Sequence, residues 1–60
     1  MPDYGNFILE GQNKLDAEDY QAALTAYKKA AELKPDEKLP QERITEIENT
    51  LAELQAKEEK

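Results

Sequence analysis

Apolar residues recur along most of this chain at intervals of three or four positions, which is the spacing of one face of an α-helix. Three segments show this pattern: residues from about 4 to 16, from about 19 to 34, and from about 40 to 57. No segment alternates between apolar and polar residues with the period of two that is typical of a strand. We therefore predict an all-α fold, and the 60 residues suffice for one small domain, residues 1–60.

The first segment carries one apolar stripe and leaves a leucine outside it. At about 100° per residue, five residues fall on one side of the helix: Tyr4, Phe7, Ile8, Gly11 and Leu15. Leu9 lies on a neighbouring face, together with Gly5, Gln12 and Asp16. Contact with a single neighbouring helix would leave this second face uncovered.

The second segment carries two apolar stripes. One consists of Tyr20, Ala23, Leu24, Tyr27 and Ala31, and the other of Ala22, Ala26, Ala30 and Leu33. The remaining face is polar, with Gln21, Thr25, Lys28, Lys29 and Glu32. Asp19 is the predicted N-cap, and Pro35 cannot continue the helix. Because short linkers make consecutive helices pack antiparallel, we expect this helix to lie between the other two, with Gly11 packed against Ala23.

The third segment is predicted to begin at Pro40, since proline suits the first position of a helix. Its apolar residues form a narrow seam, which we expect to pack on the Ala22, Ala26 and Leu33 side of the second helix: Ile44, Ile47, Leu51 and Leu54. The opposite side is polar, with Glu42, Glu46, Asn49 and Glu53. The charged tail from Ala56 is expected to fray.

Seven positions together resemble one tetratricopeptide repeat, a helix–turn–helix unit of about 34 residues. They are Phe7, Gly11, Tyr20, Ala23, Tyr27, Ala30 and Pro35. The resemblance implies an antiparallel helical hairpin over residues 4–35 and a third, capping helix over residues 36–60. Glu10, Lys14 and Glu18 depart from it, since the family usually has Leu, Tyr and Gly there. A single repeat with its cap is unusually small, since such repeats normally occur in several copies. Two interpretations stay open: a natural short protein, or an excised or engineered unit.

The resemblance also implies a protein-interaction module that holds a partner peptide on the inner face of the first helix. The corresponding positions are Ile8, Leu9, Gln12, Leu15 and Asp16, and the third helix could add Glu42, Arg43, Glu46 and Asn49. Members that clamp the acidic tails of heat-shock chaperones use Lys and Asn or Arg where this chain has Ile8 and Gln12, so that activity is not expected. The alternative is a minimal scaffold without a ligand, in which Leu9 is simply exposed or joins a weak homodimer.

The charge and the residue types exclude several other functions. The formal net charge is −6, divided as −3 over residues 1–18, +1 over residues 19–34 and −4 over residues 35–60. Such a chain repels phosphates, so neither nucleic acid nor an anionic membrane is an expected partner. No apolar run approaches the length of a membrane span and no signal-peptide pattern opens the chain, so a natural, full-length protein would be cytoplasmic.

Catalysis, metal binding and cofactor binding are not expected either. The chain has no Cys and no His, which removes the usual zinc ligands and any Ser–His or Cys–His pair. Its two glycines form no phosphate-binding loop. The 14 acidic residues lie on faces predicted to be solvated, whereas general acid–base chemistry needs carboxyl groups with shifted pKa values.

Overall fold

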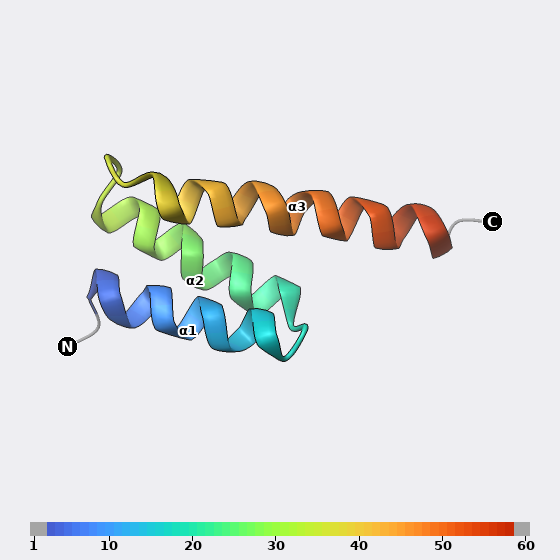
Figure 1. Ribbon diagram of the computed structural model, residues 1–60, viewed down its shortest axis with the longest axis horizontal. Coiled ribbons are helices and arrows are strands. Elements are labelled where there is room, and N and C mark those ends of the chain that lie inside the picture. Colours follow the sequence, from blue (N-terminus) through green and yellow to red (C-terminus); the bar gives the residue numbers. More distant parts are fainter. Residues whose placement is uncertain (1–2, 59–60) are drawn as a thin grey trace.

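The computed structural model describes residues 3–58, and that range contains three helices and no strand. The helices are α1 (Tyr4–Asp16), α2 (Tyr20–Leu33) and α3 (Lys38–Glu58). Figure 1 shows them side by side, with α2 between α1 and α3. The predicted all-α fold, a helical hairpin followed by a third helix, is confirmed. The bounds predicted for the first two helices agree with the structure to within a residue.

The connection between α1 and α2 is a tight turn that ends one helix and begins the next. The backbone N–H of Glu18 donates to the carbonyl of Leu15 (2.9 Å), and that of Asp19 donates to the carbonyl of Lys14 (2.8 Å). These two bonds are those of a Schellman motif, which needs a left-handed residue after the helix. Glu18 fills this position with φ = 62°. Asp19 then caps α2, as predicted, because its side chain accepts the N–H of Ala22 (3.5 Å).

The middle helix contributes most of the buried core, which confirms that it is covered on two sides. Ala23, Ala26, Tyr27 and Ala30 of α2 are buried, and α3 adds Ile47. α2 packs extensively on both other helices, whereas α1 and α3 make no comparable contact with each other. The predicted polar face of α2 is exposed at all five positions: Gln21, Thr25, Lys28, Lys29 and Glu32. The small alanines therefore let two helices approach α2 at once.

The closest approach within the hairpin involves Gly11 and an aromatic ring. A Cβ atom added at Gly11 would lie 2.8–2.9 Å from three ring atoms of Tyr27. The Tyr27 ring is thus the nearest neighbour of Gly11, and the expected contact between Gly11 and Ala23 stays a prediction. At the other end of the hairpin, the Lys34 ammonium lies 5.5 Å from the centroid of the Tyr4 ring. This contact joins the start of α1 to the end of α2, as expected for two antiparallel helices.

Helix α3 begins two residues earlier than the sequence suggested. Pro40 is its third residue and is fully buried, rather than being the first residue of the helix. A proline is tolerated there because the first four N–H groups of a helix have no partner within it. The Gln41 side chain donates to the carbonyl of Pro35 (3.0 Å) and holds the linker against α3.

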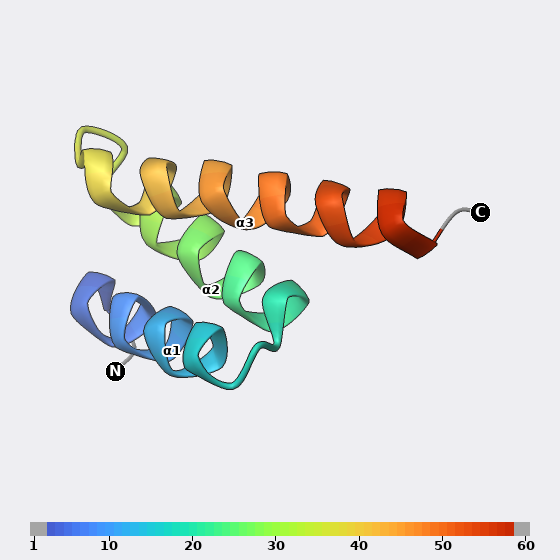
Figure 2. The same cartoon turned by 45° about the vertical axis from the view of Figure 1, so that its right-hand side comes forward.

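The far end of α3 extends beyond the hairpin (Figures 1 and 2). The helix has 21 residues against 14 in α2, and it continues to Glu58. The fraying expected from Ala56 stays a prediction. Residues 59 and 60, part of that predicted tail, lie outside the described residues.

Two residues assigned to the α2–α3 contact are exposed instead. Leu54 is 42% exposed, because α2 is too short to cover the last turns of α3. Leu33 is 52% exposed, because it is the last residue of α2, where the chain turns away into the linker. Of the predicted seam, Ile47 is buried, and Ile44 and Leu51 pack against the core.

Candidate functional site

The five residues proposed on α1 fall into two groups in the structure. Ile8 and Leu15 are half-buried and pack against the core cluster of Ala23, Tyr27 and Ile47. Leu9, Gln12 and Asp16 are exposed. The first pair therefore supports the fold, while the other three are free to meet a partner.

Leu9 lies farthest from the hairpin contact. At about 100° per residue it points about 160° away from Gly11, which faces Tyr27. Its side chain is 57% exposed, more than the other large exposed apolar residues: Leu33, Leu39 and Leu54. The prediction that Leu9 lies outside the stripe is confirmed, and its role in binding stays a prediction.

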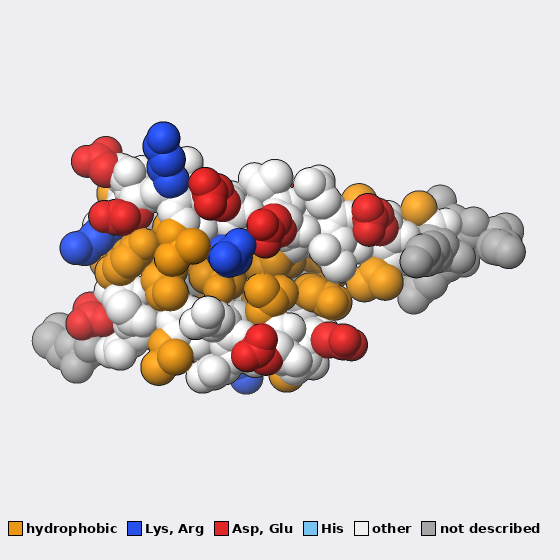
Figure 3. Space-filling model, in the orientation of Figure 1, with side chains coloured by type: hydrophobic (Ala, Val, Ile, Leu, Met, Phe, Trp, Pro, Cys, Tyr) orange, Lys and Arg blue, Asp and Glu red, His pale blue; other side chains and the backbone are white. Residues whose placement is uncertain are grey.

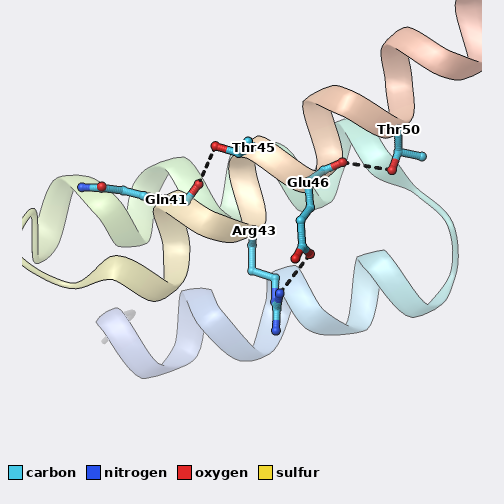
Figure 4. Close-up of polar contacts among 5 residues, drawn as sticks. All are labelled: Gln41, Arg43, Thr45, Glu46 and Thr50. Carbon is cyan, nitrogen blue, oxygen red and sulfur yellow. Dashed lines mark hydrogen bonds and ion pairs between the residues drawn. The ribbon is translucent and has the colours of Figure 1, made fainter.

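The four residues suggested on α3 are also divided. Arg43 and Glu46 project from α3 toward α1 in Figure 4 and form an ion pair, with 2.9 Å between Arg43 NH1 and Glu46 Oε1. Glu42 and Asn49 are exposed and lie farther round the helix, away from the buried seam. The structure thus places Arg43 and Glu46 on the side of α3 that faces α1, and it does not bring Glu42 and Asn49 to that side.

Charged side chains from both neighbouring helices act on the Tyr27 hydroxyl of α2: Asp16 from α1, and the ion-paired Arg43 and Glu46 from α3. Burial raises the pKa of the Tyr27 hydroxyl above its ordinary value of 10.0, and the negative charges of Asp16 and Glu46 raise it further. The charge of Arg43 and its hydrogen bond with the hydroxyl partly offset these effects. The hydroxyl is therefore neutral at physiological pH, and three charged side chains lie close enough to act on it.

An apolar band runs between α1 and α3 on the face shown in Figure 3, with acidic side chains on both of its borders and basic side chains at one end and near its middle. Ile8 and Leu15 of α1 are half-buried residues that pack on the core. On α3, Leu39 precedes Arg43 by one turn and Thr50 follows Glu46 by one turn, so these four residues share one edge. We use the name α1–α3 face for Ile8, Gln12, Leu15 and Asp16 of α1 together with Leu39, Arg43, Glu46 and Thr50 of α3.

Leu39 and Thr50 were missed by the sequence analysis. Leu39 is 39% exposed, and the Thr50 hydroxyl donates to the carbonyl of Glu46 (2.9 Å), as Figure 4 shows. The spacing of residues 39, 43, 46 and 50 is that of one helical edge and could have identified them. The sequence analysis considered only the apolar positions of the third helix. It therefore did not identify an edge in which Arg43 and Glu46 are charged.

Other parts of the surface are weaker candidates for a binding site. A depression along α3 is lined by Lys38, Gln41, Glu42, Thr45 and Glu46, all from one helix, so no second element encloses it. Within residues 3–58, no three Asp or Glu side chains come together in a way that could hold a metal ion. Over the same range, no helix has both the length and the apolar character needed to cross a bilayer.

Comparisons with known proteins give no relative: no protein-family model, no curated protein and no solved structure matches this chain. The candidate site therefore depends on its own geometry and on the resemblance of its sequence pattern to a tetratricopeptide repeat.

Proposed function

We propose that this protein is a non-catalytic interaction module of the tetratricopeptide type, which binds a peptide segment of another protein on the α1–α3 face. One observation carries the proposal: apolar side chains remain half-covered between two helices that pack on α2 but make no comparable contact with each other. A segment laid between α1 and α3 would cover them. Exposed apolar surface bordered by polar residues is a common mark of a protein-binding site.

The fold gives such a segment a rigid support. Tyr27 and Ile47 are 1% exposed, so the floor beneath the band is close-packed and cannot collapse into it. The exposed Gln12 on α1, and Arg43 and Glu46 on α3, then supply hydrogen-bonding groups on the two borders. Binding surfaces of this kind combine apolar contacts for affinity with a few polar contacts for orientation.

The test is selection from a random peptide library displayed on phage, followed by ¹⁵N–¹H NMR titration of the selected peptides. We expect the largest amide shifts at Gln12, Asp16, Arg43 and Glu46, and small shifts on the polar face of α2. Gln12→Ala should weaken binding at least about threefold, a modest interface effect. Gln21→Ala is the matched control, since it removes another exposed glutamine, on the polar face of α2, and should change nothing.

Two results would contradict this proposal. Selected peptides whose shifts cluster on α2 or on the outer side of α3 would move the site elsewhere. Failure to select any binding peptide would favour the minimal scaffold, which folds and has no ligand.

A further inference from the structure

The apolar seam of α3 continues past the end of α2. Tyr20, the first residue of α2, and Leu51 of α3 both pack against the core cluster. Leu54 lies one turn beyond Leu51 and is 42% exposed, because the antiparallel α2 begins at Tyr20 and cannot cover it. From Leu51 to Glu58, the last residue of α3, the helix rises about 10 Å, or two turns. Figures 1 and 2 show that this part of α3 extends past the connection between α1 and α2.

The spacing of the seam indicates that its uncovered end suits a helix. Its residues follow one another at intervals of three, four and three positions, the pattern with which one helix packs on another: Ile44, Ile47, Leu51 and Leu54. The first three of them lie in or against the core cluster. A helix of another molecule, placed in line with α2, would meet the last turns of the same pattern. An extended segment has a period of two and would match only part of it.

The sequence around this end of the molecule carries negative charge. Residues 14–20, which contain the α1–α2 turn, have three acids and one lysine, and residues 51–60 have three acids and two lysines. Glu18 and Asp19 are exposed and directly precede Tyr20, so they lie at the end of α2 beyond which α3 extends. Positive charge on a segment bound here would therefore strengthen binding, and negative charge would weaken it.

We infer that the overhanging end of α3 is a second docking surface, which binds a basic amphipathic helix of another protein in line with α2. We use the name overhang site for Glu18, Asp19, Leu51 and Leu54. The apolar side of the partner helix covers the two leucines, and its Lys or Arg side chains lie near the two acids. The overhang site shares no residue with the α1–α3 face, so the inference goes beyond the proposed function. A second copy of this chain suits the site less well, because two such ends are both acidic and repel each other.

The experiment compares three hydrocarbon-stapled helical peptides that have the same leucine seam and carry Lys, Gln or Glu beside it. Fluorescence anisotropy gives their dissociation constants for the full chain at low and high salt. We expect the Lys peptide to bind about tenfold more tightly than the Gln peptide and the Glu peptide to bind most weakly. High salt should reduce these differences, because it screens exposed charges.

A ¹⁵N–¹H NMR titration with the Lys peptide locates the bound helix. We expect the largest amide shifts at Glu18, Leu51 and Leu54. The amides of Gln12 and Leu39, which belong to the α1–α3 face, should shift little.

Variants then test the residues of the overhang site. Leu54→Gln should weaken the Lys peptide about tenfold, because it removes an exposed apolar contact. Leu33→Gln is the matched control, since it removes another exposed leucine, at the opposite end of α2, and should change nothing. Glu18→Gln should weaken the same peptide about threefold, while Glu37→Gln, which removes an exposed acid from the linker, should not. Circular dichroism confirms that each variant is folded, and if Leu54→Gln unfolds, Glu18→Gln and the NMR shifts still decide the matter.

Several results would overturn the inference. Equal binding of the three peptides, or tightest binding of the Glu peptide, would mean that the overhang site does not select a basic partner. Shifts centred on Gln12 and Leu39 would place the peptide on the α1–α3 face instead. A wild-type dimer in light scattering that Leu54→Gln abolishes would mean that a second copy covers this end. If none of the three peptides binds, the inference fails and the proposed function still stands on the α1–α3 face.

Discussion

The α1–α2 hairpin and helix α3 are held in place by different kinds of contact. Within the hairpin, a Schellman turn at Glu18, the Gly11–Tyr27 approach and the Lys34–Tyr4 contact fix the two helices at the turn, the middle and the open end. α3 is attached through a narrower seam centred on Ile47, and its last turns extend past α2. The hairpin is thus joined at three points along its length, whereas α3 depends on how well one side of it fits α2.

The two borders of the apolar band differ in how they are supported. One border lies on the hairpin, which is joined at three points, and the other lies on α3, which is attached through the seam around Ile47. The following changes test this division, from the largest expected effect to the smallest.

Removing α3 should abolish the fold. Truncation after Pro35 exposes Ala26 and Ala30, which are buried in the full chain, and removes Ile47 from the core. We expect the fragment of residues 1–35 to be largely unfolded or aggregated, because so short a chain cannot bury enough apolar surface. Circular dichroism with thermal melting tests this, and a monomeric fragment with a cooperative melt would show that the hairpin is stable without α3.

Ala23→Leu should destabilise both the α1–α2 hairpin and its packing against α3. Ala23 is fully buried in the cluster with Tyr27 and Ile47, so extra methyl groups have no space there. Overpacking of this kind costs about 1–3 kcal/mol. Thr25→Ala, on the exposed face of α2, is the comparison and should be nearly neutral or slightly stabilising. Urea denaturation gives both free energies, and a larger loss for Thr25→Ala would mean that the assigned faces of α2 are wrong.

Gly11→Ala should destabilise the hairpin although alanine is the better helix former. The added Cβ would lie 2.8–2.9 Å from ring atoms of Tyr27, whose ring is buried and cannot move freely. Overpacking of about 1–3 kcal/mol exceeds the gain of about 1 kcal/mol in helix propensity, leaving a net loss of about 1 kcal/mol. Gly5→Ala is the control, since its Cβ would meet only Asp3 Oδ1 at 3.7 Å, and it should stabilise. Equal effects of the two substitutions in urea melts would rule out a tight Gly11–Tyr27 contact.

Glu18→Gly should stabilise the protein by about 0.5–1 kcal/mol, because it relieves a left-handed residue at the turn. Glu18→Ala separates this effect from the loss of a charge, since alanine keeps the Cβ atom that makes φ = 62° unfavourable. Thermal melts should show a higher midpoint for the glycine variant only. A gain of equal size with alanine would assign the effect to charge instead.

Leu9→Glu should change stability least, within about 0.5 kcal/mol, because the side chain is 57% exposed. We predict that the wild type forms a weak homodimer through α1 that strengthens with salt, as screening reduces the repulsion between chains of charge −6. The variant should be monomeric. Light scattering coupled to size exclusion measures this, and a wild type that stays monomeric at high concentration and high salt would contradict the dimer, while an unfolded variant would mean that Leu9 belongs to the core.

Helix positions could be predicted well where apolar spacing and capping residues determine them. Burial was predicted less well where it depends on the relative lengths of two packed helices. Apolar spacing and the Asp19 cap located α1 and α2, and the alanines of α2 indicated two neighbours. The start of α3 was missed because Pro40 is compatible with any position in the first turn. The exposure of Leu33 and Leu54 depends on where each helix ends against the other, which periodicity does not encode.

The candidate site was predictable in its location but not in its electrostatics. The spacing separated Leu9, Gln12 and Asp16 from the core stripe of α1, as the structure has them. The charges that act on Tyr27 come from residues up to 30 positions apart, Asp16 to Glu46. This arrangement follows from the packing of three helices and has no pattern in the sequence of any one of them.

The unequal lengths of α2 and α3 have a consequence for how the protein melts. The last turns of α3 lack a partner helix in the described chain, so their helicity depends on local hydrogen bonds and capping alone. Helices of this length without tertiary support are marginal in water and lose structure gradually as temperature rises. Far-ultraviolet circular dichroism would therefore begin to decline before the environment of Tyr27 changes. Different melting midpoints from these two probes would mean that the end of α3 unfolds separately from the core. A single free energy of unfolding would then describe the core alone.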